Sequence, residues 1–141
     1  MLKGISPILS PDLLKVLCEM GHGDEIVLAD ANFPGASTAV RLVRADGLPV
    51  VAMLNAILPL FPLDSYADPL IMMQAVPGDL LDPEVESDFM QVARRYKPDA
   101  SVPLRIERNA FYERARHAFC VVMTGEVRLY GNIILKKGVI P

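Results

Sequence analysis

The segment GHGDE, residues 21–25, contains the best candidate of this chain for proton transfer. Histidine is the side-chain type whose ordinary pKa lies nearest to neutrality, and His22 stands between two glycines at the predicted junction of a helix and a strand. Gly21 can end the helix in a left-handed conformation, and glycine also lets the backbone approach a ligand closely. A structural role is the alternative, because a histidine near a helix C-terminus interacts well with the dipole. The only other histidine, His117, lies in a predicted helix, so we expect no metal site.

Polar residues near the ends of predicted elements are the next candidates. Asp30 ends a hydrophobic strand, Asp64 follows a Pro-Leu pair, and Arg108 follows the predicted strand 104–107. Side chains in such places often line sites in α/β proteins, and a guanidinium suits hydroxyl and carboxylate recognition. Each also has a commoner structural role, as a turn-forming carboxylate or a surface ion pair. Tyr112, one turn into the next helix, is either a site residue or a core aromatic with a satisfied hydroxyl.

The segment Tyr130-Gly131-Asn132 enters the last predicted strand. A tyrosine and an amide separated by a glycine can direct neutral hydrogen-bonding groups into one cavity, as sugar recognition requires above an apolar floor. A plain hairpin turn built on the glycine explains the pattern equally well. No dinucleotide fingerprint, P-loop or nucleophile elbow occurs. The residues alone therefore indicate an α/β protein with a candidate histidine acid/base and scattered carboxylates.

Helical and strand patterns alternate along the chain and predict an α/β fold. Helices are expected to begin after the caps Ser10, Asp82 and Asn109, and another begins at Pro49 and bends or ends at Pro59. Predicted strands cover residues 25–29, 40–44, 70–76, 104–107, 118–124 and 133–136. Several connections are too short for helical crossovers. We therefore expect a single compact layered domain over residues 1–141, in which helices flank a mostly buried mixed sheet.

The composition indicates a chain with more apolar surface than its own core needs. Hydrophobic residues make up 52% of the 141 residues, and the mean hydropathy is +0.31. No window approaches the ~20 apolar residues of a membrane helix, so we expect a buried subunit interface and no membrane contact. The net charge of −3 and the absence of a basic cluster argue against nucleic acid as a partner.

The N-terminal segment and the cysteines point to the cytoplasm. Pro7 and Pro11 interrupt the stretch where a signal peptide needs a continuous apolar run. Cys18 and Cys120 have neither metal-binding spacing nor a secretory context. Each lies in an apolar stretch, so both are predicted to be buried free thiols.

Five sequence blocks carry a resemblance over nearly the whole chain. They are ISPILSPDLLKVLCEMGHGDEIVLADANFP at 5–34, VRADGLP at 43–49, PLFPLDSYADP at 59–69, FYERARHAF at 111–119 and TGEVRLYGNIILKKGV at 124–139. In this order they are similar to the fucose mutarotase and ribose pyranase family (RbsD/FucU-like). The PLDSY and FYERA portions look like the fucose branch of that family.

The resemblance implies an enzyme that opens and recloses the ring of a reducing sugar. In the fucose branch this equilibrates α- and β-L-fucose, and in the ribose branch the pyranose and furanose forms of D-ribose. Such a reaction needs removal of the O1 proton and protonation of the ring oxygen, so general acid–base catalysis suffices and no cofactor or metal is implied. The matched positions are His22 as general acid/base with Asp64 as a second catalytic residue, and Asp30, Arg108, Tyr112, Tyr130 and Asn132 as sugar-binding residues. Asp64 and Tyr112 match positions that assist catalysis or binding.

Assembly and sugar preference are also part of what the resemblance implies. The family forms ring-shaped homo-oligomers, often decamers, with sites near subunit boundaries, which agrees with the apolar surplus. Asn32 stands where some bacterial fucose members have histidine, a difference that bears on sugar preference. Two other functions stay open: a D-ribose pyranase or broader monosaccharide mutarotase, and a non-catalytic sugar-binding ring in which His22 moves no proton.

Overall fold

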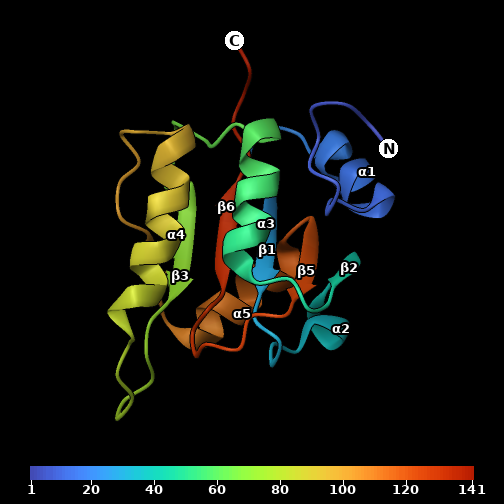
Figure 1. Ribbon diagram of the computed structural model, residues 1–141. Helices are drawn as coiled ribbons and strands as arrows, with labels where there is room; N and C mark the ends of the chain where they lie inside the picture. The colour runs from blue at the N-terminus through green and yellow to red at the C-terminus, as the bar shows by residue number, and fades with distance from the viewer.

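The computed structural model describes residues 1–141 and contains one six-stranded sheet (Figure 1). The strands are β1 Glu25–Ala29, β2 Leu42–Ala45, β3 Leu70–Met73, β4 Leu104–Ile106, β5 Cys120–Thr124 and β6 Ile133–Lys136. They lie in the order β2-β5-β1-β6-β3-β4. β6 is antiparallel to both neighbours, and the other pairs are parallel. The predicted mixed sheet is thus confirmed, because the short connection after β5 returns the chain without a crossover helix.

Helices cover both faces of this sheet. They are α1 Pro11–Glu19, α2 Gly35–Thr38, α3 Val50–Ile57, α4 Pro83–Tyr96 and α5 Arg108–His117, with a 3-10 turn at Leu58–Leu60. In Figure 1, α3 and α4 lie in front of the sheet and α5 lies behind it. Along β1, Ile26 and Leu28 join the core under α1, α3 and α4, whereas Val27 and Ala29 join the core under α5. The predicted α/β layered fold is confirmed.

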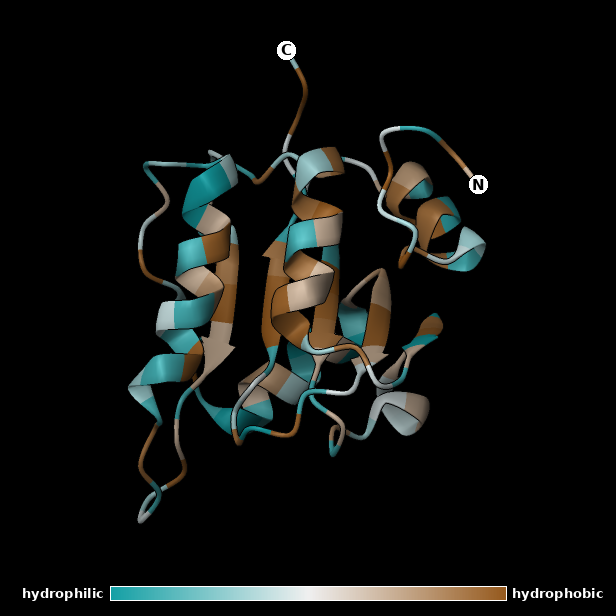
Figure 2. Cartoon of the chain, viewed as in Figure 1, coloured by the Kyte–Doolittle hydropathy of each residue, from teal (hydrophilic) through white to brown (hydrophobic).

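The hydropathy of the elements follows this layering. Figure 2 shows mostly brown strands at the centre, whereas α4 is largely teal on the side turned to the viewer. β3 and β5 are buried along their whole length, as expected for strands with helices on both faces. None of the helices is long and apolar enough to cross a membrane.

Most helix starts agree with the local sequence signals. The Ser10 hydroxyl accepts from the N–H of Leu13, and the Asp82 carboxylate accepts from the N–H of Glu84, as N-caps do. α3 follows Pro49 and ends at Ile57, before the 3-10 turn that contains Pro59. These starts and stops are local, so they could be predicted from neighbouring residues alone.

The end of α1 differs from the prediction. The helix ends at Glu19, and Met20 follows in an extended conformation. Gly23, with φ 86°, takes the left-handed conformation that was expected of Gly21. The N–H of Gly21 instead donates to Asp24 Oδ2 at 2.7 Å, and the N–H of Gly23 donates to the carbonyl of Lys137. The left-handed turn therefore lies two residues later than predicted, where the chain enters β1.

The start of α5 and several strand ends also differ. Glu107, not Asn109, caps α5: its carboxylate accepts from the N–H groups of Asn109 and Ala110. A longer side chain thus supplies the cap two residues earlier than the local pattern indicates. The strand predicted at 40–44 lies at 42–45, the strand predicted at 70–76 ends at 73, and the strand predicted at 118–124 begins at 120.

The two cysteines have different surroundings. Cys120 is buried in β5, and burial raises the pKa of its thiol to about 11. Cys18 is exposed, because α1 buries Val16 and Leu17 on its inner side and turns Cys18 outward. The prediction of a buried thiol was therefore right for Cys120 and wrong for Cys18. An apolar stretch does not tell which side of an amphipathic helix a single cysteine occupies.

Candidate active site

A buried pair of polar side chains lies where β1 ends and β6 begins. Asn132 accepts from the backbone N–H of Asp30 at 2.7 Å and donates from Nδ2 to Asp30 Oδ2 at 2.8 Å. Asp30 follows β1 directly and Asn132 directly precedes β6, so the antiparallel pairing of these strands brings them together. Both residues are buried, with 9% and 3% of their surfaces exposed. Asn132 therefore fixes the direction of the Asp30 carboxylate.

The Asp30 carboxylate is unusually basic for an aspartate. Burial raises its pKa above the ordinary value, and the nearby Glu126 adds to this effect. Hydrogen bonds from Asn32 and Asn132 lower the pKa but offset only part of the increase. A partly desolvated carboxylate of this kind accepts hydrogen bonds strongly from ligand hydroxyl groups.

The residues around this pair form a cavity of about 240 Å³. Its volume lies below the range usual for drug-sized ligands. The cavity contains all five residues predicted to bind sugar: Asp30, Arg108, Tyr112, Tyr130 and Asn132. The structure adds apolar walls, which are Phe33, Met73, Val76 and Leu129, and one further acid, Asp79. Polar groups thus converge above an apolar lining.

Tyr130, in the β5–β6 connection, also lines this pocket. It is the one residue other than glycine with a positive φ, at 59°. Its hydroxyl donates to Asp79 Oδ2 at 2.6 Å and accepts from the N–H of Val76 at 3.1 Å. Arg108, at the first turn of α5, and Tyr112, one turn later, approach the same cavity from behind the sheet.

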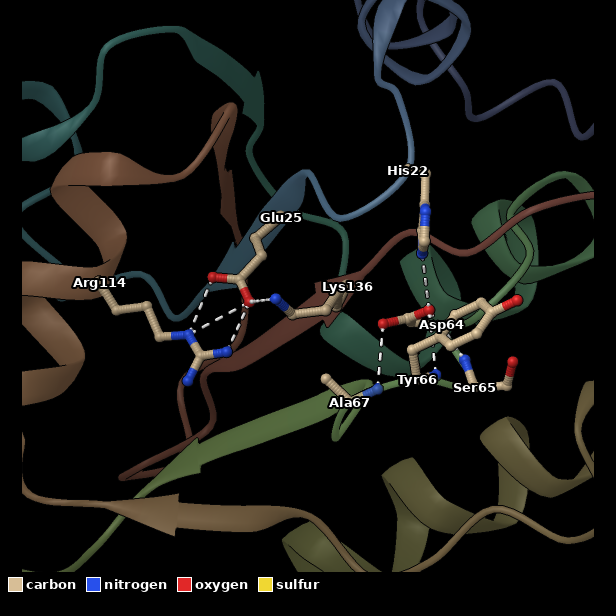
Figure 3. A network of polar contacts seen from close by, with 8 residues as sticks. All are labelled: His22, Glu25, Asp64, Ser65, Tyr66, Ala67, Arg114 and Lys136. Carbon is tan, nitrogen blue, oxygen red and sulfur yellow. Dashed lines mark hydrogen bonds and ion pairs between the residues drawn. The ribbon is translucent and has the colours of Figure 1, made fainter.

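The two residues predicted to act in catalysis form a separate pair. His22 Nε2 lies 3.0 Å from Asp64 Oδ1, and the Tyr66 ring lies beside the imidazole with a centroid separation of 5.4 Å (Figure 3). The His22 side chain is 46% exposed, whereas that of Asp64 is 4% exposed. The arrangement therefore presents an imidazole to the surface and holds it from below with a buried carboxylate.

Asp64 is held as an anion by its own loop. The N–H groups of Ser65 and Tyr66 bond to Oδ1 and that of Ala67 bonds to Oδ2 (Figure 3). Burial raises the pKa of Asp64, but the hydrogen bonds from His22 and from this loop outweigh it and bring the pKa below its ordinary value. Because an ionised carboxylate only accepts, the neutral imidazole carries its proton on Nε2. Nδ1 is then the nitrogen free to accept a proton.

An ion-pair cluster lies beside this pair at the start of β1. Glu25 accepts three hydrogen bonds from Arg114, the shortest at 2.6 Å, and Lys136 Nζ lies 3.4 Å from Glu25 Oε2 (Figure 3). Burial raises the pKa of Glu25, but both cations together bring it below the ordinary value. The carbonyl of Lys136 also accepts from the N–H of Asp64 at 3.0 Å. β6 thus supports both the cluster and the histidine–aspartate pair.

The pocket and the histidine–aspartate pair lie at opposite ends of the strands of the sheet. His22 precedes β1 and Asp30 follows it. β1 has five residues, and at the usual rise of ~3.3 Å per residue its first and last Cα atoms are roughly 13 Å apart. One subunit therefore brings the five predicted binding residues together but keeps His22 and Asp64 away from them.

Comparison with known proteins places this geometry in a family. Residues 3–140 match the RbsD / FucU transport protein family. A fucose mutarotase from Streptococcus pneumoniae, solved in complex with L-fucose, is 49% identical, with 99% of this chain and 100% of that chain covered and a TM-score of 0.94. FucU from Bifidobacterium longum is 45% identical, with coverage of 99% and 100% and a TM-score of 0.93.

A more distant structure shares the fold. RbsD from Bacillus subtilis, solved with D-ribose, is 21% identical, with both chains covered completely and a TM-score of 0.76. At this identity the likeness concerns the fold alone. The family match and the two relatives above 40% identity, each aligned from end to end, go further. This chain belongs to the RbsD/FucU family.

Proposed function

We propose that this protein is an L-fucose mutarotase, an isomerase that interconverts the α and β anomers by opening and reclosing the sugar ring. The observation that carries the proposal is the pocket beside β1. There a carboxylate, a guanidinium, two phenols and an amide converge above an apolar lining. The likeness to a fucose mutarotase solved with its sugar supports L-fucose over D-ribose as the substrate, since the ribose-bound relative is much more distant.

The proposed reaction is a proton transfer in two stages. Neutral His22 removes the O1 proton through Nδ1, and the resulting imidazolium returns a proton to the ring oxygen as the bond from C1 to that oxygen breaks. Both oxygens are bonded to C1, so one nitrogen can serve them in turn. The aldehyde rotates about C1–C2 and closes on its other face by the reverse steps. Asp64 stabilises the imidazolium, as a buried carboxylate does for a catalytic histidine.

The site that this reaction needs is shared between subunits. The pocket and the His22–Asp64 pair, called the dyad below, lie at opposite ends of the strands of one sheet. We therefore infer that the dyad of one subunit closes the pocket of its neighbour in a homo-oligomer. Two different patches that meet in this way form a heterologous interface, the type from which a closed ring is built when the rotation between subunits closes. Val127 and Leu129, in the connection that carries Tyr130, are 77% and 70% exposed and supply apolar surface for such a contact. A homodecameric ring is the assembly that we propose.

The remaining assignments follow from this function. Asp30, Arg108, Tyr112, Tyr130 and Asn132 bind the sugar hydroxyl groups, and His22 with Asp64 moves the proton. The whole chain 1–141 serves as one mutarotase domain. The reduced cysteines Cys18 and Cys120 are consistent with work in the cytoplasm.

Saturation-transfer NMR on anomeric protons tests the proposal. Irradiating the α-anomer signal of L-fucose should reduce the β-anomer signal in the presence of the protein and not in buffer alone. D-ribose and other monosaccharides form the comparison panel, and L-fucose should exchange fastest. Faster exchange of D-ribose would make the protein a ribose pyranase. Binding without exchange of any sugar would make it a sugar-binding ring and contradict the proposal.

A further inference from the structure

The loop between β3 and α4, residues 74–82, forms one wall of the pocket and contacts Tyr130 twice. Asp79 Oδ2 accepts from the Tyr130 hydroxyl at 2.6 Å, and the N–H of Val76 donates to the same oxygen at 3.1 Å. In Figure 1 this loop extends beyond the sheet at the edge where β1 ends. Asp79 therefore both lines the pocket and holds the hydroxyl of a second residue that lines it.

These two contacts determine how Tyr130 can bond to a ligand. A phenolic oxygen has one proton to donate and two acceptor sites. Asp79 takes the proton, and Val76 occupies one acceptor site. One acceptor site remains, so Tyr130 can receive a hydrogen bond from a ligand hydroxyl but has no proton left to donate. An ionised carboxylate cannot donate, so the direction of the bond to Asp79 is fixed.

The backbone and the hydroxyl of Tyr130 are both held by their surroundings. A positive φ is unfavourable for a bulky residue and persists only where its surroundings hold it. The bond to Asp79 is short, as a bond to a charged acceptor is. This bond raises the pKa of Tyr130, and the smaller opposing effects of the Val76 amide and Arg108 do not cancel it. The hydroxyl thus stays protonated, with its proton on the side of Asp79.

We propose that Asp79 is a positioning residue that holds the Tyr130 proton, so that the Tyr130 oxygen accepts a hydrogen bond from one hydroxyl of the bound monosaccharide. This inference rests on the proposed function of the pocket. A sugar in which that hydroxyl is missing or methylated cannot supply the proton. The Asp79–Tyr130 pair therefore makes the pocket select a hydroxyl donor at one position of the ring.

The kinetic test compares Asp79→Asn, Tyr130→Phe and the double variant. Asparagine keeps the size of the side chain but loses the charge and can turn an N–H toward Tyr130. We expect a KM for L-fucose about 10-fold higher in Asp79→Asn with little change in kcat, as for loss of one hydrogen bond in ground and transition states alike. In the Tyr130→Phe background, Asp79→Asn should add no further effect. Leu80→Ala, in the same loop and 92% exposed, is the matched control and should leave both constants unchanged.

An alkaline titration without sugar measures the ionisation of Tyr130, which would not change if Asp79 only stabilised the loop. For each protein, we subtract the tyrosinate absorbance of the corresponding Tyr130→Phe variant. The difference reports the ionisation of Tyr130 alone. In Asp79→Asn, Tyr130 should ionise at lower pH than in the parent. An unshifted titration, a parental KM in Asp79→Asn, or an undiminished effect in the Tyr130→Phe background overturns the inference. Absence of anomer exchange in the parent protein overturns the proposed function instead, and is read from a different sample.

Discussion

His22 Nε2 and Asp64 Oδ1 lie 3.0 Å apart, although 42 positions separate the two residues in the chain. The contact depends on Lys137, because Leu63, directly before Asp64, forms an antiparallel bridge with Lys137, and the N–H of Gly23, directly after His22, donates to the Lys137 carbonyl. Because three backbone N–H groups hold the carboxylate, the orientation of the imidazole is set before any ligand binds. Nδ1 thus faces outward at the edge of the sheet opposite to the pocket.

Replacing His22 should abolish most of the catalysis without disturbing the fold. His22→Ala should lower anomer exchange by ~10²-fold or more, the lower range for general acid–base catalysis. Its melting temperature should stay near that of the parent, because 46% of the His22 side-chain surface is exposed. Exchange measured by saturation-transfer NMR, together with a thermal melt, checks both parts. Retained exchange in a folded His22→Ala protein would make His22 structural and leave Asp30 as the leading acid/base.

Asp64→Asn separates charge from shape in the same pair. Asparagine retains one acceptor oxygen for the loop but cannot stabilise an imidazolium as an anion does. Exchange should fall by roughly 10-fold or more, in line with the ~1.5–3 kcal/mol of a hydrogen bond to a charged group. The matched control is Asp68→Asn, an exposed residue of the same loop. Equal exchange in the two variants would remove Asp64 from the mechanism.

Substitutions at Arg108 and Asn132 should both weaken sugar binding, but only the one at Asn132 should lower the stability of the fold. Arg108 is exposed at the pocket, so Arg108→Ala should weaken L-fucose binding by ~10- to 100-fold with an unchanged melt. Asn132→Ala should weaken binding and also destabilise the fold by about 1–3 kcal/mol, because it leaves buried groups of Asp30 unpaired. Calorimetric titration and urea unfolding measure the two quantities. An equally destabilised Arg108→Ala would contradict this division.

The ion-pair cluster at Glu25 should contribute stability that depends on pH. Because the folded-state pKa of Glu25 is below its ordinary value of 4.5, its contribution is present above pH 4.5 and lost as the pH falls through the folded-state pKa. Glu25→Gln should therefore melt lower than the parent at neutral pH, and the difference should narrow in acid. Glu113→Gln, at a carboxylate that is 61% exposed, is the control and should change little at any pH. A difference that is constant with pH would show that packing rather than charge is responsible.

Local elements of the fold could be predicted, but long-range pairings could not. The strands Glu25–Ala29 and Ile133–Lys136 were predicted with their observed bounds, because each is a continuous apolar run beside a glycine-containing turn. The insertion of β6 between β1 and β3 is different. It depends on which apolar surfaces meet in three dimensions, and no local pattern specifies that.

The candidate site shows the same division. Asp30 and Asn132 could be proposed from their places at strand ends, but their contact across 102 positions follows from the register of β1 and β6. Asp79 was missed, because an acid in the exposed VPGD turn looks locally like the helix cap Asp82. The separation of His22 from Asp30, by contrast, follows from the predicted strand, since the two residues flank its opposite ends.

A large assembly is expected in dilute solution. The apolar side chains at the pocket edge, Val127 and Leu129, are largely exposed in one subunit, so an interface should cover them. Light scattering should give a mass many times that of the 15.5 kDa chain. Val127→Asp should reduce this mass and the exchange activity together. A fully active monomer would refute the shared site.

Mixing two inactive variants tests the central claim most directly. One variant, His22→Ala, keeps an intact pocket; the other, Arg108→Ala with Tyr130→Phe, keeps an intact dyad. If each site takes its pocket from one subunit and its dyad from the neighbour, randomly mixed oligomers should recover about a quarter of the parent activity, since half of the pockets and half of the dyads are intact. If each subunit forms its own site, every site in the mixture lacks one half. Mixed oligomers that exchange L-fucose anomers no faster than the two variants alone would contradict the account.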